Sequence, residues 1–178
     1  MTENRGLSPR MGTLIFTLLV PIPMTGVIPW WITRWRFERP WFGLDWSRGV
    51  GACMIVAGAA LLLSALAWFA HQGVKPYPPI KRLITTGPYA YTRNPMYTGV
   101  ILILSGQSLL FGSRALAIYA VCFFTAFVVL EWTIDDPFIK RHIGRPYEDY
   151  MRDVPGWIPR RPRKKAPPAT VGNLPTRG

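Results

Sequence analysis

Residues 94–134 read NPMYTGVILILSGQSLLFGSRALAIYAVCFFTAFVVLEWTI, and their only charged side chains are Arg114 and Glu131. The two apolar runs on either side of Arg114 each match the roughly 20 residues that a helix needs to cross a membrane. The turn between them, Gly112-Ser113-Arg114, is too short for anything but an antiparallel helical hairpin. This stretch therefore predicts two membrane-spanning helices, over about residues 95–113 and 115–134.

Two further runs without charged residues lie nearer the amino terminus, over residues 11–33 and 49–70. Each is long enough to predict another membrane span. Pro21, Pro23 and Pro29 each remove a backbone donor from the first run, so we expect a kink or break there. Four spans leave too little chain for a separate nucleotide-binding sheet, which excludes a Rossmann domain.

The predicted fold is therefore an all-α, polytopic membrane bundle of about four transmembrane helices, in a single domain over residues 1–159. The chain has 178 residues, with 21 Lys and Arg against 9 Asp and Glu, and a net charge of +12. Most of the basic residues lie before the first span, between the second and third spans, and after the fourth. The positive-inside rule places these segments, and so both termini, in the cytoplasm.

Residues 160–178 are basic and rich in proline, and they predict a disordered tail. A nucleic-acid role is the least expected one, because the basic residues of this tail are not interleaved with aromatic residues. Cys53 and Cys122 fall inside apolar spans, where we interpret them as packing residues. His71 and His142 lie far apart in sequence and have few Cys or His neighbours, so we expect no metal site.

The segment between the second and third spans contains GPYAYTRNPMYTG at residues 87–99, which is unusually rich in Tyr and Pro for a connecting loop. A helix should begin near Pro95, with Asn94 as its cap. Backbone N–H groups at that start, together with Arg93, would bind a carboxylate or a phosphate. In the alternative interpretation, the tyrosines form an aromatic belt and Arg93 extends to the lipid head groups.

Three of the nine acidic residues follow one another closely at the end of the fourth span, namely Glu131, Asp135 and Asp136. Glu131 and Asp135 are four residues apart, which places them on one face of a helix. Carboxylates at membrane depth are costly, and such residues are functional more often than not. The alternative is that they pair with Arg93 for structural reasons.

These two regions resemble the sequence signatures of the isoprenylcysteine carboxyl methyltransferase and phospholipid methyltransferase superfamily of integral membrane enzymes. Residues 87–99 resemble its motif G-P-Y-x-Y-x-R-H-P-x-Y-x-G. Residues 135–159 are similar to E-E-x-x-L-x-x-x-F-G-x-x-Y-x-x-Y-x-x-x-V-P-x-x-I-P, with Asp135 and Asp136 at the paired acids. This sequence departs from the pattern at Asn94, which replaces the family's His, and at the two Asp residues, which are one methylene shorter than Glu.

The resemblance implies S-adenosylmethionine as cofactor, bound on the cytoplasmic side by the loop and the C-terminal helical region. The implied cofactor-binding residues are Tyr89, Arg93, Asn94, Pro95, Tyr97, Gly99, Asp135, Asp136 and Tyr147. The paired acids would hold the cofactor's ammonium group, and Arg93 would attract its carboxylate. We take Arg93 and Glu131 as the candidate catalytic residues, and Glu131 as the visible candidate for a base.

The predicted function is methyl transfer from S-adenosylmethionine to a membrane-associated lipidic acceptor, such as a prenylcysteine carboxylate, which needs no base. One alternative is a phosphatidylethanolamine-type N-methyltransferase, whose amine must lose a proton. Another is an NADPH-dependent membrane reductase of the steroid reductase type, although the paired acids would repel the phosphates of a dinucleotide. The last is a non-catalytic membrane protein that binds lipids.

Overall fold

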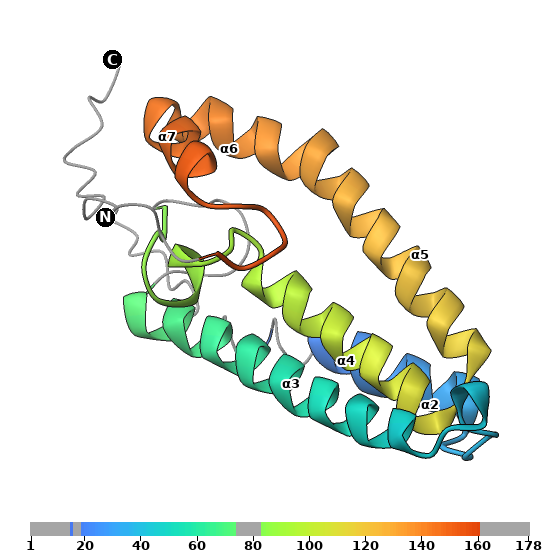
Figure 1. Ribbon diagram of the computed structural model, residues 1–178. Helices are drawn as coiled ribbons and strands as arrows, with labels where there is room; N and C mark the ends of the chain where they lie inside the picture. Colours follow the sequence, from blue (N-terminus) through green and yellow to red (C-terminus); the bar gives the residue numbers. More distant parts are fainter. Residues whose placement is uncertain (1–14, 16–18, 74–82, 161–178) are drawn as a thin grey trace.

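The computed structural model describes residue 15, residues 19–73 and residues 83–160. All regular elements in this part of the chain are helical, which confirms the predicted all-α class (Figure 1). In chain order they are η1 (Pro23–Val27), α2 (Ile28–Thr33), η2 (Trp41–Gly43), α3 (Trp46–Gln72), η3 (Gly87–Ala90), α4 (Pro95–Phe111), α5 (Arg114–Leu130), η4 (Glu131–Asp135), α6 (Asp136–Ile143) and α7 (Arg145–Asp153). Of these, η1 and η4 are π-helical turns, and η2 and η3 are 3₁₀ turns.

Two helical stretches are long and apolar enough to cross a membrane: α3, and the continuous helix Arg114–Ile143 formed by α5, η4 and α6. They correspond to the second and fourth predicted spans, and the second of these helices continues past residue 134. Helix α4, at the third predicted span, is shorter, with 17 residues. Residues 11–14 and 16–18 of the first predicted span lie outside the described part of the chain, as does the predicted tail beyond Arg160. The four-span topology stays a prediction.

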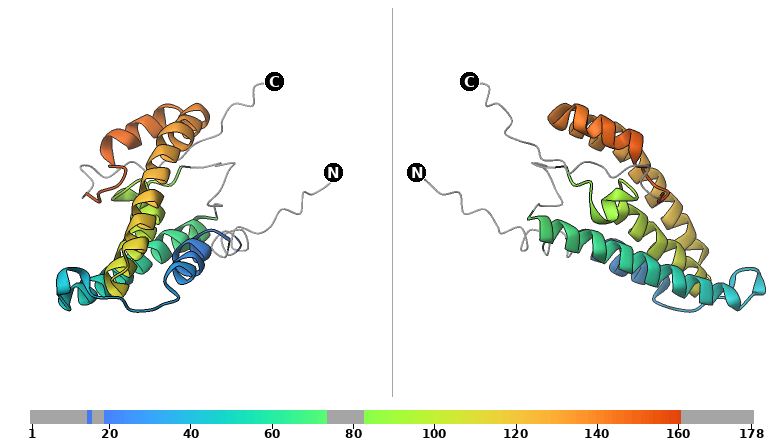
Figure 2. Two further views of the ribbon diagram at one scale, coloured as in Figure 1. Left: turned by 90° about the vertical axis from the view of Figure 1, so that its right-hand side faces the viewer. Right: turned by 60° about the vertical axis from the view of Figure 1, so that its left-hand side comes forward.

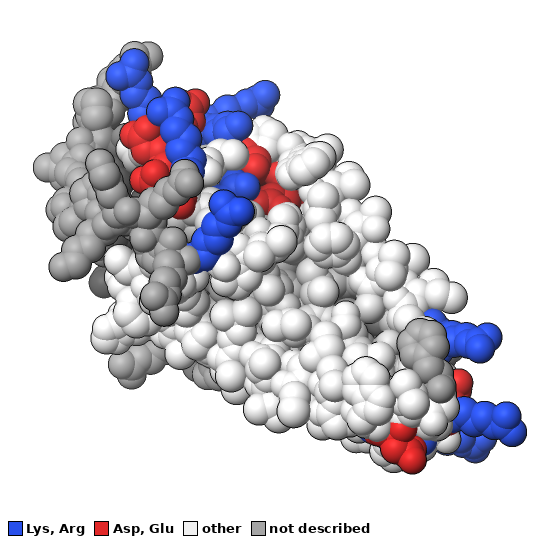
Figure 3. Space-filling view, in the orientation of Figure 1, with Lys and Arg blue, Asp and Glu red and all other residues white. Residues whose placement is uncertain are grey.

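Charged side chains gather at the two ends of the face shown in Figure 3, with an uncharged band between them. The two views of Figure 2 show α7 at one end of the molecule and η2 at the opposite end. Large apolar side chains are exposed on α3 and α5, among them Val56, Leu63, Ile118 and Val121. This distribution is expected where hydrocarbon surrounds the middle of a helical protein.

The interpretation of the two cysteines as packing residues is wrong. Cys53 on α3 and Cys122 on α5 are both free and exposed. Each lies in an apolar helix, but on a side that no other described element covers. The apolar character of a span therefore does not by itself predict burial within the protein at a given position.

Helices α3 and α4 lie so close that their backbones touch at two pairs of glycines. A Cβ atom added to Gly58 would lie 2.6 Å from the carbonyl oxygen of Gly99. One added to Gly51 would lie 2.6 Å from the carbonyl oxygen of Gly106. Small residues permit this kind of close approach between helices in a membrane, where lipid gives little hydrophobic driving force for association.

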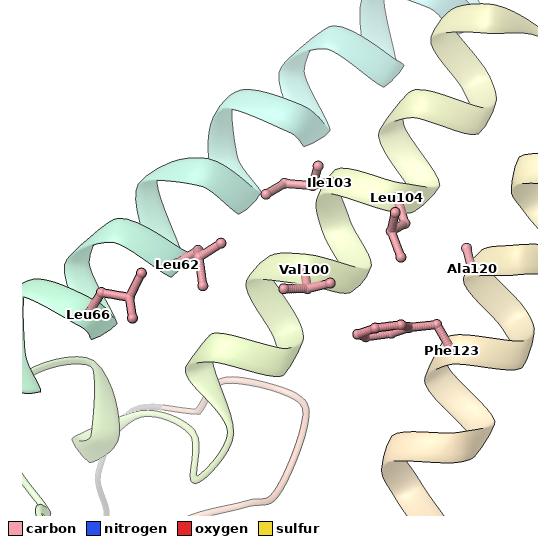
Figure 4. Close-up of a cluster of buried hydrophobic side chains, with 7 residues drawn as sticks. All are labelled: Leu62, Leu66, Val100, Ile103, Leu104, Ala120 and Phe123. Carbon is pink, nitrogen blue, oxygen red and sulfur yellow. The ribbon is translucent and has the colours of Figure 1, made fainter. Parts of the chain in front are cut away.

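The main apolar core lies where α3, α4 and α5 face one another (Figure 4). Its buried members are Leu62 and Leu66 on α3, Val100, Ile103 and Leu104 on α4, and Ala120 and Phe123 on α5. In the close-up, the ring of Phe123 extends from α5 toward α4. This core fills the middle of the bundle and forms the floor of the cavity described below.

The turn between α4 and α5 confirms the predicted helical hairpin. Gly112 ends α4 with a φ of 72°, in the left-handed region that favours glycine, and Ser113 precedes the first residue of α5. The carbonyl oxygen of Arg39 lies directly against Gly112, so a side chain there would also clash. From this turn the two helices diverge, and their far ends are the most widely separated (Figure 1).

The expected break in the first apolar run is present as the π-helical turn η1. Such a turn frees backbone carbonyls from their usual partners, and at membrane depth other groups must satisfy them. Gln107 on α4 donates through Nε2 to the carbonyl oxygen of Thr25 at 2.7 Å. Tyr119 on α5 donates through its hydroxyl to the carbonyl oxygen of Met24 at 3.2 Å. The turn therefore links the first helical segment to both α4 and α5.

Candidate functional site

A cavity of about 320 Å³ lies between the start of α4, the end of α5 and the segments that follow each of them. Its volume is within the range typical of small-molecule sites. One part of its lining is apolar and comes from the core and the first helical segment: Val20, Pro21, Met24, Leu62, Val100, Phe123 and Phe127. The other part is polar and consists of Arg93, Asn94, Tyr97, Glu131, Asp135 and Asp136. The polar part is called the polar end below.

Arg93 is the centre of the polar end. Its Nη1 donates to Asp136 Oδ1 at 3.3 Å, and its Nη2 lies 3.6 Å from Glu131 Oε1. The side chain is only 13% exposed. The alternative in which Arg93 extends to lipid head groups is therefore wrong, and the alternative in which the carboxylates pair with Arg93 is the arrangement observed.

The π-helical turn η4 determines which carboxylates face Arg93. In this turn the backbone N–H of Asp136 bonds to the carbonyl oxygen of Glu131, five residues earlier. The wider turn brings residues five apart onto one side, whereas a regular helix aligns residues three or four apart. As a result, Arg93 contacts Glu131 and Asp136. Asp135, which we expected to share a face with Glu131, instead accepts a hydrogen bond from the Tyr97 hydroxyl at 3.3 Å.

Asn94 is the residue that precedes α4, as predicted, but its side chain does not cap the helix. The side-chain amide donates to Glu131 Oε1 instead. The first turn of α4 is stabilised by Thr98, whose hydroxyl donates to the Asn94 carbonyl oxygen at 2.9 Å. Asn94 thus joins the loop to the end of α5, and the expectation of a side-chain cap is wrong.

Two tyrosines of α7 complete the polar end from the other side. The hydroxyl of Tyr147 donates to Asp136 Oδ1, and that of Tyr150 donates to the carbonyl oxygen of Tyr89 at 2.6 Å. Burial raises the pKa of the Tyr150 phenol, and burial together with the hydrogen bond to Asp136 raises the pKa of Tyr147. Both phenols therefore remain protonated and act as hydrogen-bond donors.

The segment after α7 closes over the loop that carries Arg93. The carbonyl oxygen of Gly156 accepts from the Thr92 hydroxyl at 2.7 Å and from the Asn94 backbone N–H at 3.2 Å. The Arg93 backbone N–H donates to the carbonyl oxygen of Pro155 at 2.9 Å. A Cβ atom on Gly156 would lie 3.1 Å from Arg93 Nη2. The sequence analysis did not include Thr92 and Gly156 among the site residues. The V-P-x-x-I-P stretch at residues 154–159, which contains Gly156, was the one signal that pointed to this contact.

The structure places the remaining predicted residues in different ways. Pro95 is the first residue of α4, is fully buried and lines the cavity. Gly99 faces α3 instead, since a Cβ atom there would lie 2.9 Å from the carbonyl oxygen of Gly58. Its observed role is thus close helix packing, and it is the one predicted cofactor-binding residue that does not line the cavity.

Three buried polar atoms around the cavity have no hydrogen-bond partner within the described part of the chain: Tyr89 Oη, Arg93 Nε and Glu131 Oε2. Burial, with smaller contributions from Tyr150 and Tyr97, raises the pKa of Tyr89 well above its ordinary value, so its phenol is neutral. Buried polar atoms are nearly always paired in native proteins. The residues that carry these three unpaired atoms all line the cavity.

The lining of the cavity carries an excess of negative charge. Among the described residues that line it, Glu131, Asp135 and Asp136 are the carboxylates, and Arg93 is the single Lys or Arg. The polar end therefore attracts a ligand with net positive charge and repels anions that bring no compensating cation. The apolar remainder of the lining suits an aromatic or aliphatic group.

Comparison with known sequences gives a consistent result. The sequence family described as Phospholipid methyltransferase matches residues 46–145, which is more than half of the chain. Protein-S-isoprenylcysteine O-methyltransferase of Schizosaccharomyces pombe is 30% identical over 77 residues, covering 43% of this chain and 33% of that protein. Protein-S-isoprenylcysteine O-methyltransferase B of Arabidopsis thaliana is 26% identical over 125 residues, covering 64% of this chain and 60% of that protein.

The matched segments span less than two thirds of the length of either relative. No solved structure matches the chain. The family match includes α3, α4 and α5 with the loop that carries Arg93, and it ends at the first residue of α7. The family match therefore covers Arg93, Asn94, Tyr97, Glu131, Asp135 and Asp136 of the polar end, but not Tyr147 and Tyr150 of α7.

Proposed function

The chain belongs to the phospholipid methyltransferase family, and from this premise we propose that it transfers a methyl group from S-adenosylmethionine to an acceptor with an apolar chain. Family membership and the apolar helices α3 and Arg114–Ile143 indicate an integral membrane protein. The proposed site lies on the cytoplasmic side, at the end of the molecule where the basic flanking segments are predicted to be.

The observation that carries the proposal is the charge of the polar end. Three carboxylates and one guanidinium line the polar end of a cavity that is otherwise apolar. S-adenosylmethionine has an ammonium group, a sulfonium and one carboxylate, so it is a net cation with an aromatic part. The lining complements both properties, which supports this cofactor.

Individual residues fit the charged groups of this cofactor. Asp135 and Asp136 would attract its ammonium group, and the unpaired Nε of Arg93 would donate to its carboxylate. The ring of Tyr97, which lines the cavity, would offer a π face to the sulfonium. When bound, S-adenosylmethionine supplies an electrophilic methyl group. The chain's own contribution is to orient the reactants and to exclude water.

The same observation disfavours a nicotinamide dinucleotide. Its phosphates are anionic, and Arg93, the single basic residue among the described residues of the lining, already faces Glu131 and Asp136. A dinucleotide would therefore place several negative charges beside three carboxylates. This favours methyl transfer over the reductase alternative.

The test is a pair of calorimetric titrations of the detergent-purified protein. One uses S-adenosylhomocysteine and the other uses reduced nicotinamide dinucleotide phosphate. We expect saturable binding of S-adenosylhomocysteine alone. Binding of the dinucleotide alone would convert the assignment to a membrane reductase. Binding of neither, by a sample that unfolds cooperatively on heating, would leave a non-catalytic lipid-binding protein.

A further inference from the structure

The end of the molecule away from the cavity is rich in arginine. It is formed by residues 34–48, the end of α4 and the start of α5, and the right-hand group of charges in Figure 3 lies there. Its basic residues are Arg34, Arg36, Arg39, Arg48 and Arg114, and its acidic residues are Glu38 and Asp45. Within residues 19–73 and 83–160, neither acid forms an ion pair with any of these arginines. This surface, called the arginine end below, therefore carries an excess of unpaired positive charge.

Three of these arginines, far apart in sequence, are brought to one turn of the chain. The carbonyl oxygen of Arg39 lies directly against Gly112, in the turn between α4 and α5. Arg48, near the start of α3, donates through Nη2 to the carbonyl oxygen of Glu38 at 3.0 Å. Arg114 is the first residue of α5, two positions after Gly112. The fold thus gathers basic residues from three elements around the closed end of the hairpin.

Aromatic rings lie beside these arginines. The Arg34 guanidinium lies 4.7 Å from the ring centre of Trp30, and that of Arg48 lies 5.4 Å from the ring centre of Phe37. Contacts of this kind orient a guanidinium and leave its charge in place. The exposed rings of this region are Trp30, Trp31, Trp35, Phe37 and Trp46. Tryptophan is enriched where head groups meet hydrocarbon, which indicates that the arginine end lies at the level of the lipid head groups.

The backbone between α2 and the arginine end adopts a conformation that residues with side chains seldom take. Arg34 and Trp35 follow one another with φ of 50° and 55°, both in the left-handed region. The Thr33 hydroxyl accepts from the Trp35 N–H at 3.0 Å and stabilises this turn. Beyond it, the ring of Phe37 lies 5.0 Å from that of Phe111 at the end of α4. The strained turn therefore brings the chain back to the hairpin, and strain of this kind often accompanies a binding role.

The predicted topology makes so many arginines at this end unexpected. With both termini in the cytoplasm, the arginine end lies on the opposite side of the membrane, where Lys and Arg are depleted. An anionic partner at head-group level would compensate their charge. Arginine pairs with phosphate through two parallel N–H groups. Helices α3 and α5 lead from this end into the apolar band with exposed apolar side chains, so a partner with acyl chains fits best.

We propose that the arginine end binds the phosphate of an anionic phospholipid, through Arg39, Arg48 and Arg114, with the exposed tryptophans beside its glycerol backbone. The lipid would fix the closed end of the hairpin at one membrane surface, while the open end carries the candidate site. This inference goes beyond the proposed methyl transfer and does not depend on it. A free phosphate ion offers the same charge but no acyl chains, so it would leave the exposed tryptophans unused.

The test measures which lipids surround the protein in phosphatidylcholine vesicles. Five of the eight tryptophans lie between residues 30 and 46, so tryptophan fluorescence reports mainly on the arginine end. One series replaces a growing share of the lipid with dibrominated phosphatidylglycerol, which quenches this fluorescence, and a parallel series uses dibrominated phosphatidylcholine. The two quenching curves give a relative association constant. The wild type should prefer phosphatidylglycerol about fivefold, as expected for basic residues at the surface.

The variant combines Arg39→Gln with Arg114→Gln. Both side chains are exposed and form no hydrogen bond or ion pair within the described part of the chain, so the fold should be kept. The preference for phosphatidylglycerol should fall close to one. The matched control combines Arg141→Gln with Arg145→Gln, the same loss of charge at exposed positions of α6 and α7, and it should keep the preference. If the first pair does not fold, Arg114→Gln alone, against Arg141→Gln, takes its place.

Three results would overturn the proposal. Equal quenching of the wild type by the two lipids would show that the arginine end does not select an anionic head group. Equal losses in the two double variants would show that net charge alone sets the preference. Sodium phosphate should not reduce the preference more than sodium chloride of the same ionic strength. A larger reduction by phosphate would assign the surface to the free ion, and the lipid would be the wrong ligand.

Discussion

Helix α4 has two long neighbours, and it is joined to them in opposite ways. Against α3, the two backbones touch at the pairs Gly58–Gly99 and Gly51–Gly106. Against α5, it is joined by the Gly112 turn at one end and by polar side chains at the other. The contacts between α3 and α4 are also far more extensive than those between α4 and α5.

The difference explains where the cavity lies. Close backbone contact leaves no room for a cavity between α3 and α4, so these two helices form one packed layer, called the wall below. The hairpin of α4 and α5 diverges from its turn, and the space at its open end is the cavity. The groups that bridge this open end are Arg93, Asn94 and the carboxylates that they contact. The proposed binding groups thus also hold the two helices together.

Removing the bridge should have the largest effect. Arg93→Ala leaves the buried carboxylates of Glu131 and Asp136 without their cation. We expect a loss of about 3 kcal/mol in the free energy of unfolding, the order found when a buried pair loses one partner. The measurement is the thermal unfolding midpoint in detergent.

The control for that variant is Arg152→Ala on α7. Arg152 lies 3.7 Å from Asp149, and both side chains are more than 70% exposed. Exposed pairs of this kind contribute little to stability, so the midpoint should hardly change. Equal shifts for the two variants would show that the Arg93 bridge does not hold the open end of the hairpin.

The wall between α3 and α4 should be the next most sensitive feature. In Gly58→Ala the new methyl group would lie 2.6 Å from the Gly99 carbonyl oxygen, and the two helices must separate to accept it. We expect a loss of about 2 kcal/mol, in the range for overpacked cores. The same change at Gly49 on α3 meets no atom within 4 Å and should be nearly neutral. A Gly58→Ala variant as stable as Gly49→Ala would contradict the close contact.

A change at Asp136 separates the structural role of the polar end from its proposed role in binding. Asp136→Asn keeps the shape of the side chain but removes the charge that Arg93 faces and that a cofactor ammonium would need. We expect the affinity for S-adenosylhomocysteine to fall about tenfold, which corresponds to about 1.4 kcal/mol. Asp149→Asn, at an exposed position of α7, is the control and should bind normally. Unchanged affinity in Asp136→Asn would remove this residue from the cofactor site.

The sequence predicted the features of this comparison that depend on local signals. The Gly112-Ser113-Arg114 turn, the start of α4 at Pro95 and the break at the prolines of the first run are all confirmed. Each depends on a residue whose backbone preference acts within one or two positions. The sequence offered the pairing of Arg93 with the carboxylates as an alternative to a purely functional role, and the structure shows that pairing.

Other features depend on contacts between distant parts of the chain. Whether Asn94 caps its own helix or bonds to Glu131 is decided by where the end of α5 lies, which the sequence around Asn94 does not reveal. The π-helical turn η4 changes which carboxylate faces Arg93, and its weak sequence signal is Pro137, which has no N–H for a regular helical bond. The role of Gly99 was misassigned because a glycine gives the same signal for backbone approach to a ligand or to a helix.

The smallest expected effect concerns the hydrogen bonds of η1, which lie outside both the α3–α4 contact and the α4–α5 hairpin. The π-helical turn η1 bonds to α4 through Gln107 and to α5 through Tyr119, so it ties the wall to the diverging helix. Tyr119→Phe removes one hydrogen bond to the Met24 carbonyl oxygen and leaves the ring in place. We expect a loss of about 1 kcal/mol, as for one hydrogen bond. Tyr91→Phe, at an exposed ring, should leave the unfolding midpoint unchanged. If Tyr119→Phe is equally neutral, then α5 is positioned by the Gly112 turn and the Arg93 bridge without help from η1.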